Sequence, residues 1–291
     1  MDFPVKYADT KTNLPFLQHI SDPPKSLTYR GTLPAPELKL LTVVGARKYT
    51  TYGQQVVNYL IDGLAGYPVG IVSGLALGID ALAHEAALRN NLYTLAIPGS
   101  GIDDSVIYPR RHRPLAQRIL SSGGGLLSEF EPTFTATKWS FAKRNRIMAA
   151  LSHATLIVEA SEKSGTLITA RLAVDYNRDL LVVPGNIFSS TAAGPHQFLK
   201  LGAFPITQAS DILHLLGIDP NARETNKTLF GSIPEISEDE QHIIRLLTEP
   251  IDKDSLIRLS KLPPATASAL LMEMEIKGLI AMEQGFVRAV V

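Results

Sequence analysis

The 291-residue chain contains no cysteine. This absence excludes a disulfide framework, a thiolate metal site and a cysteine nucleophile. It also fits a reducing compartment, and we expect a cytoplasmic protein. No apolar stretch approaches the ~20 residues that a membrane-spanning helix needs. Because the residues from Met1 to Tyr7 also lack the apolar core of a signal peptide, we expect no contact with a membrane.

The sequence also lacks an excess of either charge. Its 28 Lys and Arg residues equal its 28 Asp and Glu residues, so the formal net charge is zero. A protein that coats nucleic acid nonspecifically is usually more basic. The balance argues against such a coating protein. It still permits a local basic site, because physiological salt limits the reach of distant charges to about 8 Å.

The middle of the chain, from Leu40 to about Gly217, alternates short apolar runs with amphipathic stretches. The apolar runs predict strands at 40–44, 69–72, 92–97, 125–128, 154–158 and 180–183. The amphipathic stretches predict helices at 51–65, 78–90, 113–121, 142–151, 165–177, 194–201 and 209–216. The strand runs are almost wholly apolar, as expected when helices cover both faces of a sheet. This alternation predicts an α/β fold with a parallel sheet.

The two ends of the chain have different patterns. Residues 1–38 are rich in proline and polar residues, so we expect an extended lead-in with at most one short helix, lying against a main domain at 39–218. A polar stretch with proline and glycine at 219–236 predicts a linker. Residues 237–291 then predict three helices and a hairpin, which together form a small winged-helix-like domain.

Four of the predicted strands are followed by a turn that contains glycine. Such turns present backbone N–H groups to a phosphate at the carboxyl edge of a parallel sheet. Arg47 stands in the first turn, where its planar guanidinium suits a phosphodiester. The candidate phosphate-binding residues of these turns are Gly45, Arg47, Lys48, Ser73, Gly74, Gly78, Gly99, Gly101, Ser164, Gly165 and Thr166. An ordinary exposed loop also explains Arg47, and helix capping also explains Ser164 and Thr166.

The segment Lys138–Arg146 interleaves aromatic residues with cations. Bases stack on aromatic faces at ~1–3 kcal/mol each, while cations bind the backbone of a nucleic acid strand. The candidate DNA-binding residues are Lys138, Phe141, Lys143, Arg144, Asn145 and Arg146, together with Arg110 from the basic loop 108–113. Two alternatives stay open: Trp139 or Phe141 belongs to the core, and one of Arg144 and Arg146 is structural.

Asp80 and His84 share one face of a predicted helix at a spacing of four residues. A metal site or an acid–base pair is conceivable there, but a carboxylate at a helix start with a neighbouring histidine explains them as well. The sequence contains no catalytic constellation and no P-loop. We therefore expect a protein that is not an enzyme and that uses no cofactor or metal.

Seven motifs occur in one order along the chain: V-G-A-R-K, V-S-G-L-A-x-G-I-D-A-x-A-H, Y-P-x-x-x, L-L-S-E-F, F-x-x-R-N-R-I-x-A, S-G-T-L-I-T-A-R and V-P-G. From roughly 14 to 217, the chain thereby resembles the DprA/Smf family of bacterial DNA-processing proteins. The resemblance implies an extended Rossmann-like domain that forms homodimers, binds single-stranded DNA and loads the RecA recombinase on it, in natural transformation or recombination. It also implies phosphate binding by Arg47 and Lys138 and base stacking by Phe141.

The chain departs from the family pattern at two positions, since Leu77 replaces a frequent basic residue and His196 replaces a frequent asparagine. An enzyme is the main alternative, because Rossmann-like nucleotide glycosidases, which hydrolyse nucleoside monophosphates, also use glycine-rich turns and a glutamate. The segment 122–129, which ends in Glu129, resembles one of their motifs, although their Pro-Gly-Gly-x-Gly-Thr motif is absent. A module that only senses a nucleotide is a third interpretation.

Overall fold

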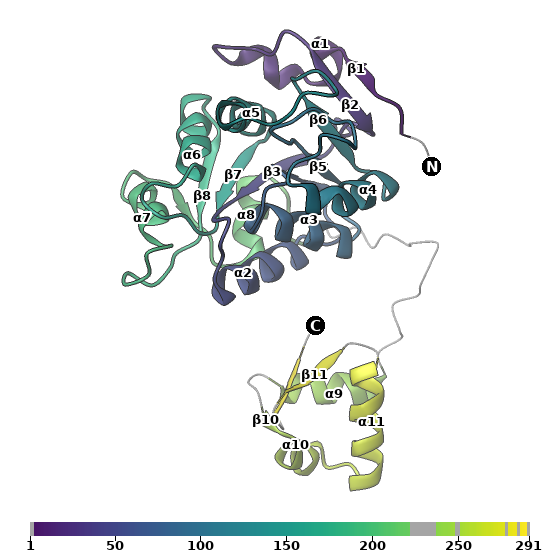
Figure 1. Ribbon diagram of the computed structural model, residues 1–291. Helices are drawn as coiled ribbons and strands as arrows, with labels where there is room; N and C mark the ends of the chain where they lie inside the picture. Colours follow the sequence, from purple (N-terminus) through teal and green to yellow (C-terminus); the bar gives the residue numbers. More distant parts are fainter. Residues whose placement is uncertain (1–2, 222–236, 248–250, 277–278, 284–285, 290–291) are drawn as a thin grey trace. The chain divides into compact units, whose positions relative to one another are not determined.

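The computed structural model of the protein describes residues 3–221, 237–247, 251–276, 279–283 and 286–289 (Figure 1). The chain divides into two compact units, Met1–Thr225 and Asn226–Val291. Most of the predicted linker, from 222 to 236, lies outside the described residues. Within the described parts of the chain, none of the helices combines the length and apolar character that crossing a bilayer requires.

The first unit is built around a nine-stranded sheet with the order β1-β2-β6-β5-β4-β3-β7-β8-β9. From β6 to β9 in this order, neighbouring strands pair in parallel, whereas β1 and β2 are antiparallel additions at one edge. The strands are β1 (Lys6–Ala8), β2 (Leu27–Gly31), β3 (Lys39–Val44), β4 (Val69–Ser73), β5 (Thr94–Ala96), β6 (Gly125–Ser128), β7 (Ala154–Ile157), β8 (Asp179–Val182) and β9 (Phe204–Pro205). The predicted α/β fold with an extended, mostly parallel sheet is confirmed.

Helices cover both faces of this sheet (Figure 1). One face carries α2 (Thr51–Asp62), α3 (Ile79–Arg89) and α8 (Ala209–Leu215), with α4 (Arg113–Ser121) beside α3, and the other carries α5 (Lys138–Leu151), α6 (Thr166–Asp175) and α7 (Ala193–Leu199). Alternate residues of β3 join the two cores: Leu41 and Val43 on the α2 side, Leu40 and Val44 on the α5 side. Because each such side chain contributes about 1.5–3 kcal/mol on full burial, both faces of the strand must be apolar.

The order of the strands reverses at β3, the middle one of the seven strands that pair in parallel. β3 pairs with β4 on one side and with β7 on the other, and Leu41 lies opposite Ile71 and Ala154. The helix that follows β3 packs on one face of the sheet, while the helix that follows β7 packs on the opposite face. In open α/β sheets such a reversal opens a crevice at the carboxyl ends of the strands, where ligands bind.

The amino-terminal segment differs from the expected extended lead-in. β2 pairs with β6 and β1 pairs with β2, so residues 1–38 contribute two strands to the sheet. The short helices α1 (Thr10–Asn13) and η1 (Pro15–His19) lie between them, and Leu14, Leu17 and Leu27 are buried. Strand β2 carries no sequence signal of a buried parallel strand, because its residues, Leu-Thr-Tyr-Arg-Gly, form no continuous apolar run.

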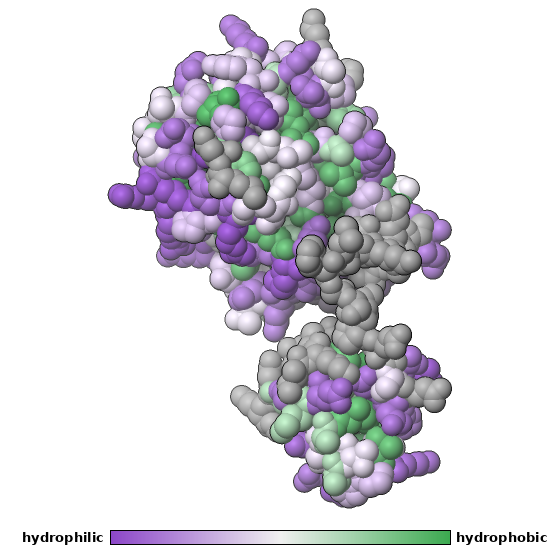
Figure 2. All heavy atoms as spheres, turned by 90° about the vertical axis from the view of Figure 1, so that its right-hand side faces the viewer, coloured by the Kyte–Doolittle hydropathy of each residue, from purple (hydrophilic) through white to green (hydrophobic). Residues whose placement is uncertain are grey.

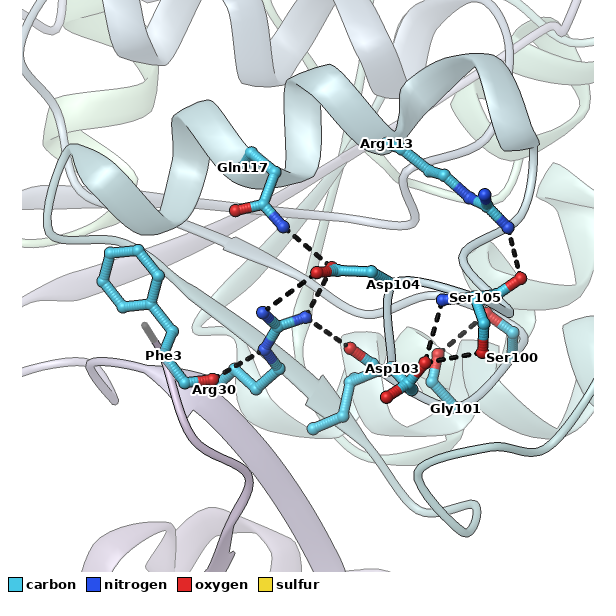
Figure 3. A network of polar contacts seen from close by, with 10 residues as sticks. Phe3, Arg30, Ser100, Gly101, Asp103, Asp104, Ser105, Arg113 and Gln117 are labelled. Carbon is cyan, nitrogen blue, oxygen red and sulfur yellow. Dashed lines mark hydrogen bonds and ion pairs between the residues drawn. The ribbon is translucent and has the colours of Figure 1, made fainter. Parts of the chain in front are cut away.

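Arg30 of β2 fixes the loop that follows β5 (Figure 3). Its Nε donates to Phe3 O at 2.9 Å, and its Nη1 donates to Ile102 O at 3.0 Å and to Asp104 Oδ1 at 2.6 Å. Gln117 of α4 donates to the same carboxylate oxygen at 2.8 Å. The added strand therefore holds the glycine turn after β5 in place from one side.

Helix α5 begins at Lys138, four residues before the predicted start at 142. Ser140 causes this difference, because its Oγ accepts a hydrogen bond from Thr137 N–H at 3.0 Å and so satisfies a free donor at the helix start. The same Oγ donates to Gly99 O at 2.6 Å, which ties the helix to the turn after β5. As a result Lys138 and Phe141 project from one rigid helix.

The second unit contains the helices and the hairpin expected for a winged helix. Its elements are α9 (Glu238–Leu246), β10 (Ile251–Asp252), α10 (Lys253–Ser260), α11 (Pro264–Ile276), β11 (Ile280–Glu283) and β12 (Phe286–Ala289). The strands form a small sheet with the order β10-β12-β11, and Ile243, Leu256, Leu271 and Met274 form the centre of its core. On the face shown in Figure 2, apolar and hydrophilic side chains of this unit lie side by side.

Candidate nucleic-acid interface

The turns after β3 and β4 pack directly against each other. Gly78 has a φ of +88°, which lies in the region that favours glycine. A Cβ at Gly78 would collide with Ala46 O, and that oxygen also accepts a hydrogen bond from Ile79 N–H at 3.1 Å. A Cβ at Gly45 would lie 2.6 Å from Ile79 Cγ1. Both glycines are therefore needed to bring these two turns together at the carboxyl edge of the sheet.

Phe141 lies over the turn after β5. A Cβ at Gly99 would come within 2.5 Å of the Phe141 ring, so only glycine lets the ring rest on this turn. The Arg47 guanidinium lies 5.5 Å from the ring centroid, and the Tyr108 ring centroid lies 5.7 Å from it. Phe141 is half-buried, whereas Tyr108 is 51% exposed. The site thus contains a fixed aromatic ring between a cation and a second, more exposed ring, an arrangement on which bases can stack.

Four of the basic residues that the sequence predicts as DNA contacts lie at this ring pair or within three residues of it or of Arg47 in the chain. Arg47, Lys48, Arg110 and Lys138 are all exposed. In the described part of the chain, none of them forms an ion pair with a carboxylate. Their charges therefore remain available to a polyanion, although the protein as a whole carries no net charge.

Lys143 points to a different environment. Its Nζ lies 3.2 Å from Glu129 Oε1, and it also lies over the rings of Trp139 and Phe130, at 5.8 Å and 5.9 Å from their centroids. Trp139 packs edge-on against Phe130 at 5.5 Å and is still 54% exposed. The charge of Lys143 is therefore compensated inside the protein, and Trp139 has a partly structural role.

Arg144 is buried beneath the interface and does not face solvent. Its Nη1 donates to Ile97 O, and its guanidinium packs so closely on Gly74 that a Cβ there would collide with it. Burial lowers the pKa of Arg144 to about 10, although the nearby Asp80 carboxylate opposes the shift. Asp80 in turn accepts hydrogen bonds from the backbone N–H groups of Gly74 at 3.1 Å and Ala76 at 3.4 Å. Arg144 and Asp80 together fix the turns after β4 and β5.

Arg146 is also buried and holds the helix from its other side. Its Nη2 donates to both oxygens of Glu129, at 2.5 and 2.6 Å, and its Nε lies 3.4 Å from Asp22 Oδ2. The sequence left open that one of Arg144 and Arg146 is structural. In the structure both side chains bind groups inside the fold. Asn145 between them is only 9% exposed, and its side chain has no hydrogen-bond partner within the described residues.

Two predicted contacts in the turns are used internally. Ser73 is fully buried and its Oγ donates to Val43 O at 2.7 Å. Gly101 is buried too, and its N–H donates to Phe134 O at 2.8 Å. These residues shape the turns, and their own polar groups do not reach the surface.

The Ser-Gly-Thr turn lies at the start of α6. Thr166 Oγ1 donates to Gly45 O at 3.1 Å, which joins this turn to the turn after β3, and Ser164 Oγ accepts from Thr166 N–H at 3.2 Å. Gly165 is exposed, and a Cβ there would meet nothing within 4 Å. The Thr166 hydroxyl thus anchors this turn to the turn that carries Arg47, and the Ser164 hydroxyl stabilises the turn internally.

Asp80 and His84 are both buried and engaged within the fold. His84 is fully buried, its Nδ1 lies 2.7 Å from Thr94 Oγ1, and burial lowers its pKa to about 3. Burial raises the pKa of Asp80, with Arg144 opposing the shift. No group of three or more His, Asp or Glu side chains that could hold a metal occurs among residues the structure describes.

His196, which stands where the family frequently has asparagine, contacts the protein itself. Its Nε2 is hydrogen-bonded to Gly185 O at 3.1 Å.

The sequence analysis did not select Tyr108 for the site. The structure places its exposed ring against Phe141. Its position at the start of the basic loop 108–113 was the signal that could have found it, because an aromatic residue beside cations is typical of sites that bind single-stranded nucleic acid.

The fold and this edge define the class of protein: an extended Rossmann-like α/β protein with a basic and aromatic carboxyl edge, followed by a winged-helix domain. The profile of the family described as DNA recombination-mediator protein A matches residues 3–217, and that of the DprA winged helix domain matches residues 231–285. The chain therefore belongs to the DprA/Smf family of DNA-processing proteins.

Individual relatives agree with this assignment. Protein Smf of Escherichia coli is 40% identical over 209 residues, which cover 72% of this chain and 55% of that protein. DNA processing protein DprA of Bacillus subtilis is 38% identical over 202 residues, 69% of this chain and 67% of that protein. The chain thus spans about half the length of the Escherichia coli relative and two thirds of the Bacillus subtilis one.

Two solved structures resemble the first unit. The crystal structure of DprA from Streptococcus pneumoniae gives a TM-score of 0.67 at 35% identity and covers 74% of each chain. DNA processing protein A from Helicobacter pylori, a structure that describes its single-stranded DNA binding mode, gives a TM-score of 0.66 at 32% identity. It covers 74% of this chain and 96% of that chain.

Proposed function

We propose that this protein binds single-stranded DNA at the carboxyl edge of its sheet, with phosphates on Arg47 and Lys138 and a base on Phe141. The observation that carries the proposal is the Arg47–Phe141 contact at 5.5 Å, flanked by exposed cations without carboxylate partners. Stacking and phosphate contacts do not read base edges, so this part of the site binds without sequence preference. The similar protein from Helicobacter pylori, whose solved structure is described as giving insights into its single-stranded DNA binding mode, supports the proposal.

The test compares the affinities for a single-stranded oligonucleotide, its duplex and a free nucleotide by fluorescence anisotropy. We expect the single strand to bind most tightly, because a duplex cannot place an unpaired base on Phe141. Its affinity should fall as the salt concentration rises. In a plot of the logarithm of the binding constant against the logarithm of the salt concentration, we expect a slope of about −0.7 for each phosphate neutralised. Equal affinity for single strand and duplex would contradict the proposal.

We further propose that the protein forms homodimers in the cytoplasm and loads RecA on single-stranded DNA, in natural transformation or recombination. Membership of the family supports this step. Light scattering on the purified chain tests the dimer. Loading is tested by the ATP hydrolysis of purified RecA on single-stranded DNA that a different protein already coats. This hydrolysis should start earlier when the chain is added.

We also propose that the protein is not an enzyme. The glycosidase alternative would need a free carboxylate at Glu129, after the Gly-Gly-Gly turn. Arg146 and Lys143 both pair with that carboxylate, and only 9% of its side chain is exposed. Incubation with nucleoside monophosphates should therefore release no base, which chromatography of the products can check.

A further inference from the structure

A cavity of about 490 Å³ lies at the same carboxyl edge, beside the phosphate-binding turns. The start of α2 and the segments after β7 and β8 line it, with Thr50, Tyr52, Glu159, Asn186 and Thr191 among its polar residues. It therefore adjoins the crevice beside β3 and β7, where the strand order reverses and where open α/β sheets bind ligands. A volume of this size lies within the range of small-molecule sites.

Glu159 supplies a buried carboxylate to this cavity. Only 3% of the residue is exposed. The carboxylate accepts hydrogen bonds from Thr50 N–H at 2.9 Å, Thr50 Oγ1 at 2.6 Å and Thr191 Oγ1 at 3.1 Å. A Cβ at Gly53 would collide with Glu159, so the first turn of α2 closes over it. Since a carboxylate has about four acceptor positions, one further donor can be accepted from a molecule in the cavity.

No cation pairs with Glu159 in the described part of the chain. The positive end of α2 compensates its charge in part. Buried carboxylates are otherwise paired or hydrogen-bonded, so an occupant that carries N–H donors would complete the site. A phosphate would be repelled, and the cavity therefore suits the base and not the backbone of a nucleotide.

The loop that closes the cavity carries exposed apolar side chains. Ile187 and Phe188 are 78% and 90% exposed and stand between two lining residues, Asn186 and Ser189. The loop is nevertheless fixed, because Phe188 N–H donates to Asn186 Oδ1 at 2.9 Å and Tyr52 donates to Pro184 O at 2.7 Å. An exposed aromatic ring in a loop that lines a cavity is available to stack on a base of a bound strand.

We propose that this cavity binds one base of the same single-stranded DNA and prefers a base with an amino group, such as cytosine or adenine. The inference rests on the proposed function. In the order β5-β4-β3-β7, three strand spacings of about 4.8 Å separate Phe141 from the cavity, or about 14 Å, which a few nucleotides can cover. The amino group of cytosine donates to a carboxylate, whereas uracil and thymine present a carbonyl oxygen at that position. The preference is added to binding that elsewhere ignores the base.

The experiment uses the full chain and two oligomers of equal length, oligodeoxycytidine and oligodeoxyuridine, whose bases differ at the 4-position, an amino group against an oxygen, and at N3, which carries a hydrogen only in uracil. Fluorescence anisotropy should show roughly tenfold tighter binding of the cytidine oligomer, as expected for one hydrogen bond to a charged group. Glu159→Gln should reduce this ratio to about one, because its amide can also donate to the uracil oxygen. The control Glu162→Gln removes an exposed carboxylate from the same loop and should leave the ratio unchanged.

A modified oligomer keeps the test independent of protein folding. Cytidine with two methyl groups on its 4-amino nitrogen has no donor there, and the unaltered protein should bind it like the uridine oligomer. If Lys138→Ala weakens binding of both oligomers but the wild-type ratio is about one, the base cavity is wrong while the proposed function stands. If neither oligomer binds, the proposed function itself fails. A ratio that survives Glu159→Gln also overturns the inference, because the preference then does not come from this carboxylate.

Discussion

Arg47 and Phe141 come from distant parts of the chain and meet with the guanidinium 5.5 Å from the ring centroid. The contact depends on two glycines, since Gly99 lets the ring rest on the turn after β5 and Gly78 lets the turn of Arg47 pack on the turn after β4. A charge and a stacking surface are thus held side by side before any ligand arrives. Such preorganisation lowers the entropic cost of binding a flexible strand.

Stacking and charge can be separated at this contact. Phe141→Ala should weaken binding of single-stranded DNA by ~1–3 kcal/mol without changing the salt dependence, because a stacked base releases no counterion. Lys138→Ala should weaken binding and also flatten the salt slope by about 0.7. Titrations at several salt concentrations measure both effects. A changed slope for Phe141→Ala would show that the ring acts through Arg47.

Arg146 should affect stability and not DNA contact. Arg146→Ala leaves Glu129 without the partner that binds both its oxygens, and breaking a buried pair in this way costs about 3–5 kcal/mol. The matched control is Lys143→Ala, which removes the more exposed partner of the same carboxylate and should cost less than about 1 kcal/mol. Urea unfolding followed by circular dichroism measures the difference. Similar losses from both substitutions would disprove the structural role of Arg146.

His84 should make the protein less stable at mildly acidic pH. Its pKa is about 3 in the fold and about 6.5 in the unfolded chain, so only the unfolded state takes up a proton between these values. Its contribution to stability is therefore complete above pH ~6.5 and falls by up to about 1.4 kcal/mol per pH unit below it. The raised pKa of Asp80 acts oppositely, since the folded state then binds the proton more tightly as the pH nears ~4.

The measurement is urea unfolding at several pH values between neutrality and pH ~5. His84→Asn removes the titrating group and places an amide where Nδ1 stands, which keeps the hydrogen bond to Thr94, so its stability should vary less with pH. His214→Gln changes an exposed histidine and should retain the wild-type pH dependence. Equal pH dependence in all three proteins would show that His84 does not control acid stability.

The sequence predicted the parallel sheet well because both its faces are buried, which makes each strand a continuous apolar run. The sequence did not predict β2, a short strand with polar residues that is stabilised by pairing with β6 and by the contacts of Arg30. In α5, helical phase did not separate buried from exposed positions: Asn145 shares a side with exposed Lys138 and is buried, and Arg144 and Arg146 are buried on other sides of the helix. These buried residues stand next to exposed cations in the sequence, so the sequence alone predicted all of them as DNA contacts.

The distances that create the interface could not be predicted, because they depend on contacts between separate turns. The glycines were recognised as turn residues, but only the structure shows what each one accommodates: the Phe141 ring at Gly99 and the Arg144 guanidinium at Gly74. The base cavity at Glu159 depends likewise on three segments that are far apart in the chain.

The winged-helix unit should contribute little to DNA binding. Its third helix, α11, carries Glu273 and Glu275 but no lysine or arginine, so a DNA backbone would be repelled from it. A chain truncated after Asn221 keeps the hydrogen bond from Tyr67 to Pro220 O, at 2.5 Å, and should remain folded. Its affinity for single-stranded DNA should stay within a few-fold of the full chain. A soluble truncation with an unchanged melting temperature that loses more than about tenfold in affinity, or ~1.4 kcal/mol, would show that this unit does hold DNA.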